Sequence, residues 1–284
     1  MVDSDGQGAL RPARALLGWM SVRRGVLALA GQRVDDERAP EYEERARQKR
    51  LVASVRRPVF GTQGVTTALP RSLQDVAERI GESRRGADLL AKGWQPALVD
   101  LRRVCAMARL AYLDVELPDV EADDLHALAE ITLPRHATGV QADYDQEAEA
   151  WLVREPTADV RVLGQFRAPG QPGVVLGLVV SRVPSFVEVA RVEDRFVLVR
   201  GYDRVISLLA QGIHSVPALV HGHRRARDLP FGRSSLARSV VMGRRPPLLP
   251  DFLDDDVSAE VLMPRTKRLL MIRALEVTHY DFEG

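Results

Sequence analysis

The sequence predicts an α+β protein, with a helix-rich N-terminal region followed by a small mixed β-sheet. Apolar residues up to about residue 140 recur at intervals of three and four, which is the helical period. After about residue 150 they occur in short, valine-rich runs separated by Pro-Gly pairs, which is typical of strands. With 284 residues and 45% hydrophobic content, the chain can form a packed core.

The N-terminal region, residues 1–145, is expected to be mainly helical. The segment at 59–70 contains two glycines and a closing proline and predicts a loop. A capping pattern of Ser72 with Asp75 begins a further helical segment, and Gly93 ends it. The segment 94–117 fits a helix and a strand equally well, so both remain open. The helices are expected at 14–30, 41–57, 73–92 and 120–131.

The C-terminal domain, residues 146–284, is expected to be built on strands. The runs at 187–192 and 196–199, joined by Glu193-Asp194-Arg195, predict a hairpin. Its second strand is apolar on both faces and should lie deeper in the sheet. The apolar run at 269–277 can add a last strand. The other expected strands lie at 160–166, 174–181 and 216–221.

The charge balance argues against a polyanionic partner for the whole chain. The 40 basic and 39 acidic residues leave a net charge of +1, so no overall field draws the protein to nucleic acid or to an anionic membrane. We therefore do not expect nucleic acid as a partner. Arginine supplies nearly all of the positive charge, and a GC-rich genome explains this more simply than selection for guanidinium groups.

The single cysteine, Cys105, excludes an internal disulfide and a cysteine-rich metal site. It is expected to be buried and structural. The apolar stretch at 15–31 is interrupted by Arg23 and Arg24, and each apolar arm is too short to cross a bilayer. The expectation is a cytoplasmic protein with no membrane partner.

A strand, a glycine turn and a helix between residues 195 and 212 form the most informative motif. Four apolar residues at helical spacing predict that the helix packs onto the sheet, and Gly212 is suited to end it. Gly201 stands where the chain must turn sharply. Arg204 opposes the helix dipole in the first turn; a bound anion would remove this conflict, and so would the neighbouring Asp203.

The segment 174–222 resembles the core of the ParB and sulfiredoxin superfamily. Members carry a strand ending in a small-residue turn, a Gly-x-x-Arg element that opens a helix, a glycine at the helix end and a Val-Pro pair before the next strand. The corresponding residues here are 196–200, Gly201-Tyr202-Asp203-Arg204, Gly212 and Val216-Pro217. The resemblance implies a small mixed sheet and a turn that binds nucleotide phosphates.

Branches of that superfamily hydrolyse CTP, repair oxidised peroxiredoxin with ATP, phosphorylate serine or cut nucleic acid. The implied ligand-binding residues here are Arg200, Gly201, Tyr202, Asp203 and Arg204. Many members have an acidic residue before the glycine and a histidine before the arginine, but Arg200 and Asp203 occupy these positions. Sulfiredoxins place their cysteine in this turn, which Cys105 does not match, so the catalytic residues stay unassigned.

Two interpretations of the turn remain open. Arg200 and Arg204 could form a two-pronged anion clamp, or Asp203 could pair with the arginines and close the site. The first interpretation predicts a nucleotide- or phosphate-binding protein, with or without Mg²⁺, for which phosphotransfer or hydrolysis and a degenerate catalytic site both remain open. The second predicts a non-catalytic adaptor or assembly component that keeps the fold and binds a protein partner.

Accessory ligand contacts are expected after the Val-Pro strand. His221 and His223 share one face of that strand, but a third ligand is not evident, so no metal site is predicted. Arg224 and Arg225 follow directly and can add positive charge. The acidic cluster at 251–256 lacks the spacing of a calcium loop and is expected to be a solvated turn.

Overall fold

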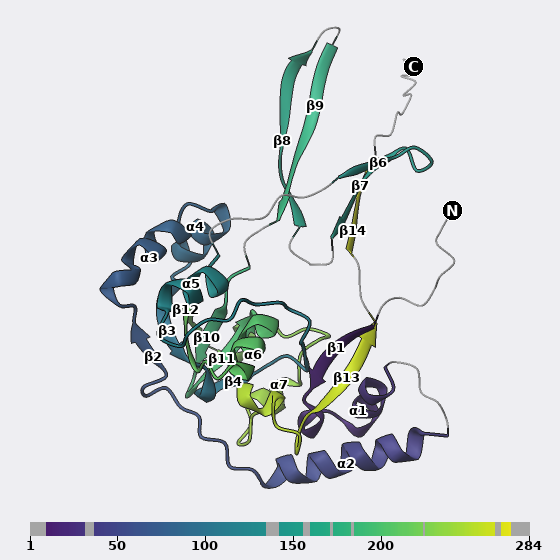
Figure 1. Cartoon of the computed structure of the whole chain (residues 1–284), viewed down its shortest axis with the longest axis vertical. Helices are drawn as coiled ribbons and strands as arrows, with labels where there is room; N and C mark the ends of the chain where they lie inside the picture. Colours follow the sequence, from purple (N-terminus) through teal and green to yellow (C-terminus); the bar gives the residue numbers. More distant parts are fainter. Residues whose placement is uncertain are drawn as a thin grey trace, which may run out of the picture. The chain divides into compact units, whose positions relative to one another are not determined.

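The computed structural model confirms the α+β class (Figure 1). It describes residues 10–31, 37–134, 142–155, 160–170, 173–182, 185–223, 225–264 and 268–273. The chain forms two compact units, one made of Met1–Arg135 with Pro184–Arg265 and the other of His136–Val183 with Thr266–Gly284. This division differs from the boundary expected after residue 145, because strands from the N-terminal region complete the sheet of the predicted C-terminal domain.

The centre of the first unit is a six-stranded sheet in the order β2-β3-β12-β10-β11-β4. The predicted hairpin is confirmed as β10 (Glu188–Val192) and β11 (Arg195–Arg200), which pair antiparallel. Helix α6 (Tyr202–Ala210) follows, and β12 (Ser215–His223) returns parallel to β10. The strand-turn-helix-strand motif therefore forms as the sequence indicated.

Strands from the N-terminal region extend this sheet on both sides. On one side β3 (Gln95–Asp100) pairs antiparallel with β12, and β2 (Thr66–Ala68), within the expected loop at 59–70, pairs with β3. On the other side β4 (Val104–Ala106) runs parallel to β11. The segment that fitted either a helix or a strand is therefore extended, apart from a 3-10 turn, η3, at Leu101–Arg103.

The expected helix at 14–30 is wrong in its first part. Strand β1 (Leu10–Ala15) pairs antiparallel with β13 (Ala259–Pro264) and with β5 (Leu110–Tyr112). A 3-10 turn, η1 (Leu17–Trp19), and the short helix α1 (Val22–Leu29) follow. Pairing between distant segments buries Ala13 and Ala15 completely, and it overrides the local helical period.

The remaining helices depart from the expected bounds at their ends. The expected helix at 41–57 is confirmed as α2 (Ala39–Val55), and the one at 120–131 as α5 (Leu125–Thr132). The segment at 73–92 contains two helices, α3 (Gln74–Ile80) and α4 (Arg84–Ala91). Ser83, and not Ser72, supplies a cap, because its hydroxyl accepts a hydrogen bond from the Gly86 N–H at 3.0 Å.

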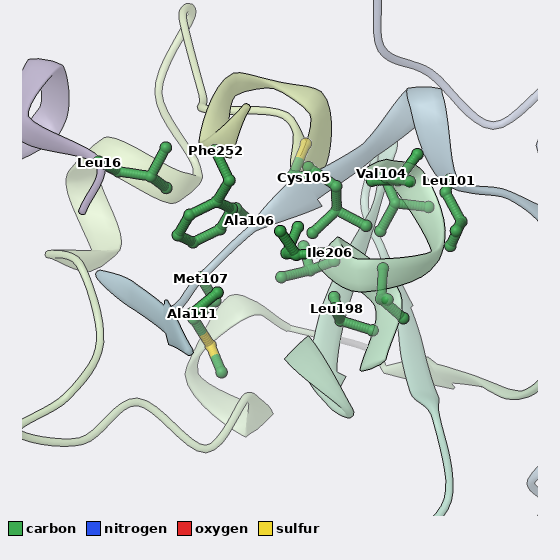
Figure 2. Packing of buried hydrophobic residues seen from close by; sticks show 14 of the residues in the cluster. Leu16, Leu101, Val104, Cys105, Ala106, Met107, Ala111, Leu198, Ile206 and Phe252 are labelled. Carbon is green, nitrogen blue, oxygen red and sulfur yellow. The ribbon is translucent and has the colours of Figure 1, made fainter. Parts of the chain in front are cut away.

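Apolar clusters cover the central sheet. The predicted stripe of α6 is buried, and Figure 2 shows Ile206 among Val104, Cys105 and Leu198, all of which are fully buried. Full burial of a side chain such as Ile206 stabilises the fold by about 1.5 to 3 kcal/mol. A second cluster combines α3 and α5 with the central sheet and contains Leu73, Val76, Ile80, Trp94, Ala129, Leu133, Phe186 and Leu219.

The elements that the structure describes in the second unit are strands. A three-stranded sheet has the order β14-β7-β6, with β6 at Asp143–Asp145, β7 at Ala150–Glu155 and β14 at Arg268–Arg273. The expected strands at 160–166 and 174–181 are confirmed as β8 (Val160–Gly170) and β9 (Gly173–Arg182), which pair as an antiparallel hairpin. The expected last strand at 269–277 is confirmed as far as residue 273, and its end lies outside the described residues.

Replacement of Gly201 by alanine is expected to destabilise the protein more than the same change at Gly212. Both glycines have positive φ, 92° and 83°, so both substitutions are strained by about 1 to 2 kcal/mol. A Cβ at Gly201 would also lie 2.8 Å from Cγ2 of Val187, whereas nothing lies within 4 Å at Gly212. We expect losses of about 2 to 4 kcal/mol for Gly201→Ala and about 1 kcal/mol for Gly212→Ala in urea unfolding. Equal losses would contradict the close packing at this turn.

Candidate functional site

In the predicted phosphate turn, the Tyr202 hydroxyl is fully used in hydrogen bonds to the backbone. The Tyr202 hydroxyl donates to the Leu198 carbonyl at 2.5 Å and accepts from the backbone N–H groups of Met107 and Ala108 at 2.6 and 3.1 Å. Burial raises the pKa of Tyr202, so its hydroxyl stays protonated. These bonds tie the start of α6 to β11 and to the segment that follows β4.

Asp203 also bonds to the backbone of another segment. Its carboxylate accepts a hydrogen bond from the Tyr112 N–H, in β5, at 3.0 Å. Burial raises the pKa of Asp203, while the Tyr112 N–H and the charges of Arg11 and Arg204 act in the opposite direction. The first turn of α6 is therefore joined through this side chain to the neighbouring sheet.

Arg204 bridges the last turn of α5 and the segment before β10 rather than pointing into open solvent. Its guanidinium donates to the carbonyls of Ile131 and Ser185, and the side chain is partly buried. Ile131 lies in the last turn of α5, where unsatisfied carbonyls attract a cation. The conflict between Arg204 and the dipole of α6 is thus offset by the carboxyl end of a second helix, without a bound anion.

Arg200 meets a carboxylate that the sequence analysis did not single out. Its Nε lies 3.6 Å from Oε2 of Glu188, whose side chain is only 5% exposed. Arg85, in α4, binds the other oxygen of Glu188. Arg200 itself is 45% exposed, so it keeps access to solvent. A single glutamate at the start of an apolar strand was the available signal for this buried ion pair.

The predicted accessory histidines form an aromatic group. The His221 ring stacks on Trp94 with centroids 5.3 Å apart, and His223 lies edge-on to His221 at 4.8 Å. Burial, with a smaller contribution from His221, lowers the pKa of His223 and favours its neutral form. Within the described part of the chain, no group of three or more His, Cys, Asp or Glu side chains is placed to hold a metal ion.

The other predicted residues do not join the turn. Arg225 is exposed, and its backbone N–H donates to the Asp228 carboxylate at 3.1 Å. Arg224 lies outside the described residues. Cys105 is buried in β4, and burial raises its pKa to about 12, which agrees with a structural thiol. The acidic cluster is partly engaged in ion pairs: Asp251 and Asp254 bind Arg56, and Asp255 binds Arg14.

A cleft of about 580 Å³ lies elsewhere in the first unit. Its volume falls within the range of about 300 to 1,000 Å³ that is usual for small-molecule sites. Four segments line it: the end of η1, the residues after α2, the helix α7 (Arg238–Val241) and the loop after α7. The lining residues are Trp19, Arg56, Arg57, Pro58, Ser239, Val240, Gly243, Arg244 and Arg245.

Hydrogen bonds between distant segments hold the walls of this arginine cleft. The Trp19 indole N–H donates to the Arg245 carbonyl at 2.8 Å, and the Arg245 guanidinium donates to the Ser54 carbonyl. From the central sheet, the buried Arg195 donates to the carbonyls of Val241 and Gly243, both at 2.9 Å. The loop after α7 is therefore anchored to β11, and the cleft does not depend on a single loop.

The cleft has an excess of positive charge. Of its four arginines, Arg56 forms ion pairs with Asp251 and Asp254; its Nη1 lies 2.8 Å from Oδ1 of Asp251. Arg57 and Arg244 are exposed, and within the described residues neither has a hydrogen bond or an ion pair. Arg245 contacts only a carbonyl through its guanidinium. Three cationic side chains with no carboxylate partner thus surround one concave surface, which favours an anionic ligand.

The sequence analysis missed this site because its parts are far apart in the chain. Arg244 and Arg245 belong to the basic segment after β12, and Arg56 and Arg57 to the end of a charged helix. Paired arginines were the available signal, but only the fold shows that they share a cleft with Trp19.

Comparison with known proteins gives no match to a family model, to a curated protein or to a solved structure. The helices of the described ranges include none with the length and apolar character needed to cross a bilayer.

Replacement of Asp203 by asparagine is expected to change how stability depends on pH. The pKa of Asp203 is raised in the folded state, mainly by burial, so the native protein binds this proton more tightly than the unfolded chain. This contribution is complete below the ordinary pKa of about 4 and is lost as the pH rises through the folded pKa. Asparagine keeps an oxygen for the Tyr112 N–H but cannot ionise.

Between about pH 4 and pH 7, wild type should therefore lose stability relative to Asp203→Asn. Urea unfolding of both proteins across this range measures the difference. A difference that does not change with pH would contradict a raised pKa at Asp203. Asp255→Asn serves as the control, because the Asp255 pKa is lowered by Arg14, and the opposite trend is expected there.

Proposed function

We propose that this chain binds a phosphate-bearing ligand without catalysing its conversion, on a fold of the ParB and sulfiredoxin type. The supporting observation is the arginine cleft, where three arginines without a carboxylate partner line about 580 Å³ beside Trp19. Guanidinium groups recognise phosphate through paired, charge-assisted hydrogen bonds. The proposal keeps the ligand class expected from the sequence and assigns it to a different surface.

The side chains of the turn are already bonded, which argues against a ligand or a catalytic site there. The side chains of Tyr202, Asp203 and Arg204 all bond to the backbone of other segments. Phosphate at this turn would have to replace these bonds, and each buried group left unpaired would cost about 1 to 3 kcal/mol. Arg200 alone remains half exposed, and it adjoins the carboxylate of Glu188. We therefore assign the turn a structural role. The proposal also keeps the cytoplasmic setting that the sequence led us to expect.

Binding of inorganic pyrophosphate is expected to depend on the cleft and not on the turn. Arg57→Ala and Arg244→Ala should each weaken binding about 10- to 100-fold, because each removes charge-assisted hydrogen bonds. Isothermal titration calorimetry at 50 and 200 mM salt, on the full chain, measures the affinity. Higher salt should weaken binding, since the contacts are exposed ion pairs.

Two controls separate this site from general surface charge and from the turn. Arg71, an exposed arginine in the 3-10 turn η2 (Arg71–Leu73), should be replaceable by alanine without a change in affinity. Arg200→Ala should also have no effect. Loss of binding only in Arg200→Ala would return the site to the turn, and no binding by wild type would remove the proposal.

A second candidate function, a non-catalytic adaptor that binds a protein partner, is favoured by an observation in the second unit. Tyr144 and Trp151 are opposite each other on β6 and β7, with rings 5.4 Å apart. They are 52% and 51% exposed. Aromatic pairs of this kind are common at the centres of protein interfaces.

The adaptor hypothesis predicts that a partner retained from a lysate of the native host is lost when Trp151 is replaced by serine. The matched control is Leu51→Ser, which removes an apolar side chain 63% exposed on α2 in the other unit. Quantitative mass spectrometry of pull-downs measures the retained protein. Retention that is equal in both variants, or a chain that elutes as a lone monomer with no partner, would contradict this function.

A further inference from the structure

Trp19 occupies a fixed position in the arginine cleft. Its indole N–H is bonded to the Arg245 carbonyl at 2.8 Å, and the two residues before it, Leu17 and Gly18, are completely or almost completely buried. Gly18 is packed so closely that a Cβ there would lie 2.7 Å from Cβ of Ala53. The backbone that carries Trp19 is thus held by α2, and the hydrogen bond to the Arg245 carbonyl links its indole to the loop after α7.

The chemistry of the cleft extends beyond phosphate binding. A phosphate or pyrophosphate needs only guanidinium groups, whereas this surface also includes the Trp19 ring, Pro58 and the Ser239 hydroxyl. An aromatic side chain lining a charged cleft offers a face on which a planar ring can stack, and stacking of a base on an aromatic side chain is worth about 1 to 3 kcal/mol. A ligand that uses the whole surface carries both a planar ring and several negative charges.

We propose that the ligand of the arginine cleft is a mononucleotide, with its base stacked on Trp19 and its phosphates between Arg57 and Arg244. This inference rests on the proposed function, because it names the ligand class of the same site. The three arginines without a carboxylate partner match the charge of a nucleoside di- or triphosphate. A volume of about 580 Å³ accommodates one such molecule.

A single nucleotide fits better than a nucleic-acid strand. Strand-binding proteins combine a long basic groove with several stacking residues. Here the cleft contains one aromatic side chain, and the fourth arginine, Arg56, is already compensated by Asp251 and Asp254. The net charge of +1 adds no long-range attraction.

Comparison of ATP and UTP with inorganic tripolyphosphate tests the contribution of the base. The three ligands carry similar charge, so calorimetry on the full chain separates stacking from phosphate binding. We expect ATP and UTP to bind about 5- to 100-fold more tightly than tripolyphosphate. In Trp19→Leu the advantage should fall below about 3-fold, whereas Trp19→Phe, which also loses the bond to the Arg245 carbonyl but keeps an aromatic ring, should retain most of it.

Fluorescence provides an independent readout that does not require loss of binding. Trp94→Phe and Trp151→Phe leave Trp19 as the only tryptophan in the doubly substituted chain, since the sequence has three. ATP and UTP should quench its emission, whereas tripolyphosphate should not. Because Trp94 contacts His221 in the second cluster, circular dichroism and unfolding of this variant verify that it remains folded.

The outcomes distinguish this inference from the proposed function. Equal affinity for ATP, UTP and tripolyphosphate would overturn the nucleotide assignment and leave phosphate binding intact. A nucleotide advantage that survived in Trp19→Leu would overturn the stacking of the base on Trp19. Absence of binding by all three ligands would overturn both proposals.

Discussion

The first unit depends on pairing both edge strands of a small central β-sheet. The hairpin β10–β11, helix α6 and strand β12 are contiguous in sequence, but alone they leave β12 and β11 with unpaired backbone groups. Strands β3 and β4, about 100 residues earlier in the chain, pair with β12 and β11 and remove these edges. The segment after β4 then lies against the first turn of α6, where its Met107 and Ala108 N–H groups donate to the Tyr202 hydroxyl. The same stretch of chain therefore pairs with an edge of the sheet and occupies the Tyr202 hydroxyl of the predicted phosphate turn.

Local features of the fold could be predicted, and long-range pairing could not. Valine-rich runs and punctuating glycines located β8 to β12, and the positive φ of Gly201 and Gly212 agrees with the turns expected there. Strand β1 was missed because its partner β13 lies about 250 residues away, and helical spacing from residue 14 onward predicted a helix that overlaps the end of β1. The sequence indicated that the charge of Arg204 opposes the dipole of α6. It did not indicate what offsets this conflict, because the carbonyls of Ile131 and Ser185 cannot be placed beside Arg204 from sequence.

Arginine has two roles in this structure, and composition alone does not separate them. Buried or partly buried guanidinium groups hold backbone carbonyls of neighbouring loops: Arg195 binds Val241 and Gly243, and Arg14 binds Phe252 at 2.6 Å. Others, such as Arg57 and Arg244, are exposed at a concave surface. The five donors of the guanidinium group suit the first role, and its permanent charge suits the second. Only the positions of acceptors in the fold distinguish them, which is why the sequence pointed to the turn instead of the cleft.

The pairing of β1 with β13 has a consequence for synthesis. The ribosome makes β1 first and reaches Pro264, its last partner residue, about 250 residues later. At about 5 to 20 residues per second, this interval lasts roughly 10 to 50 s. During it, β5 can pair with one edge of β1, and the other edge has no native neighbour. The nascent chain therefore carries an unpaired strand edge for much of its synthesis, and this is the stage at which chaperone binding or aggregation would compete with folding.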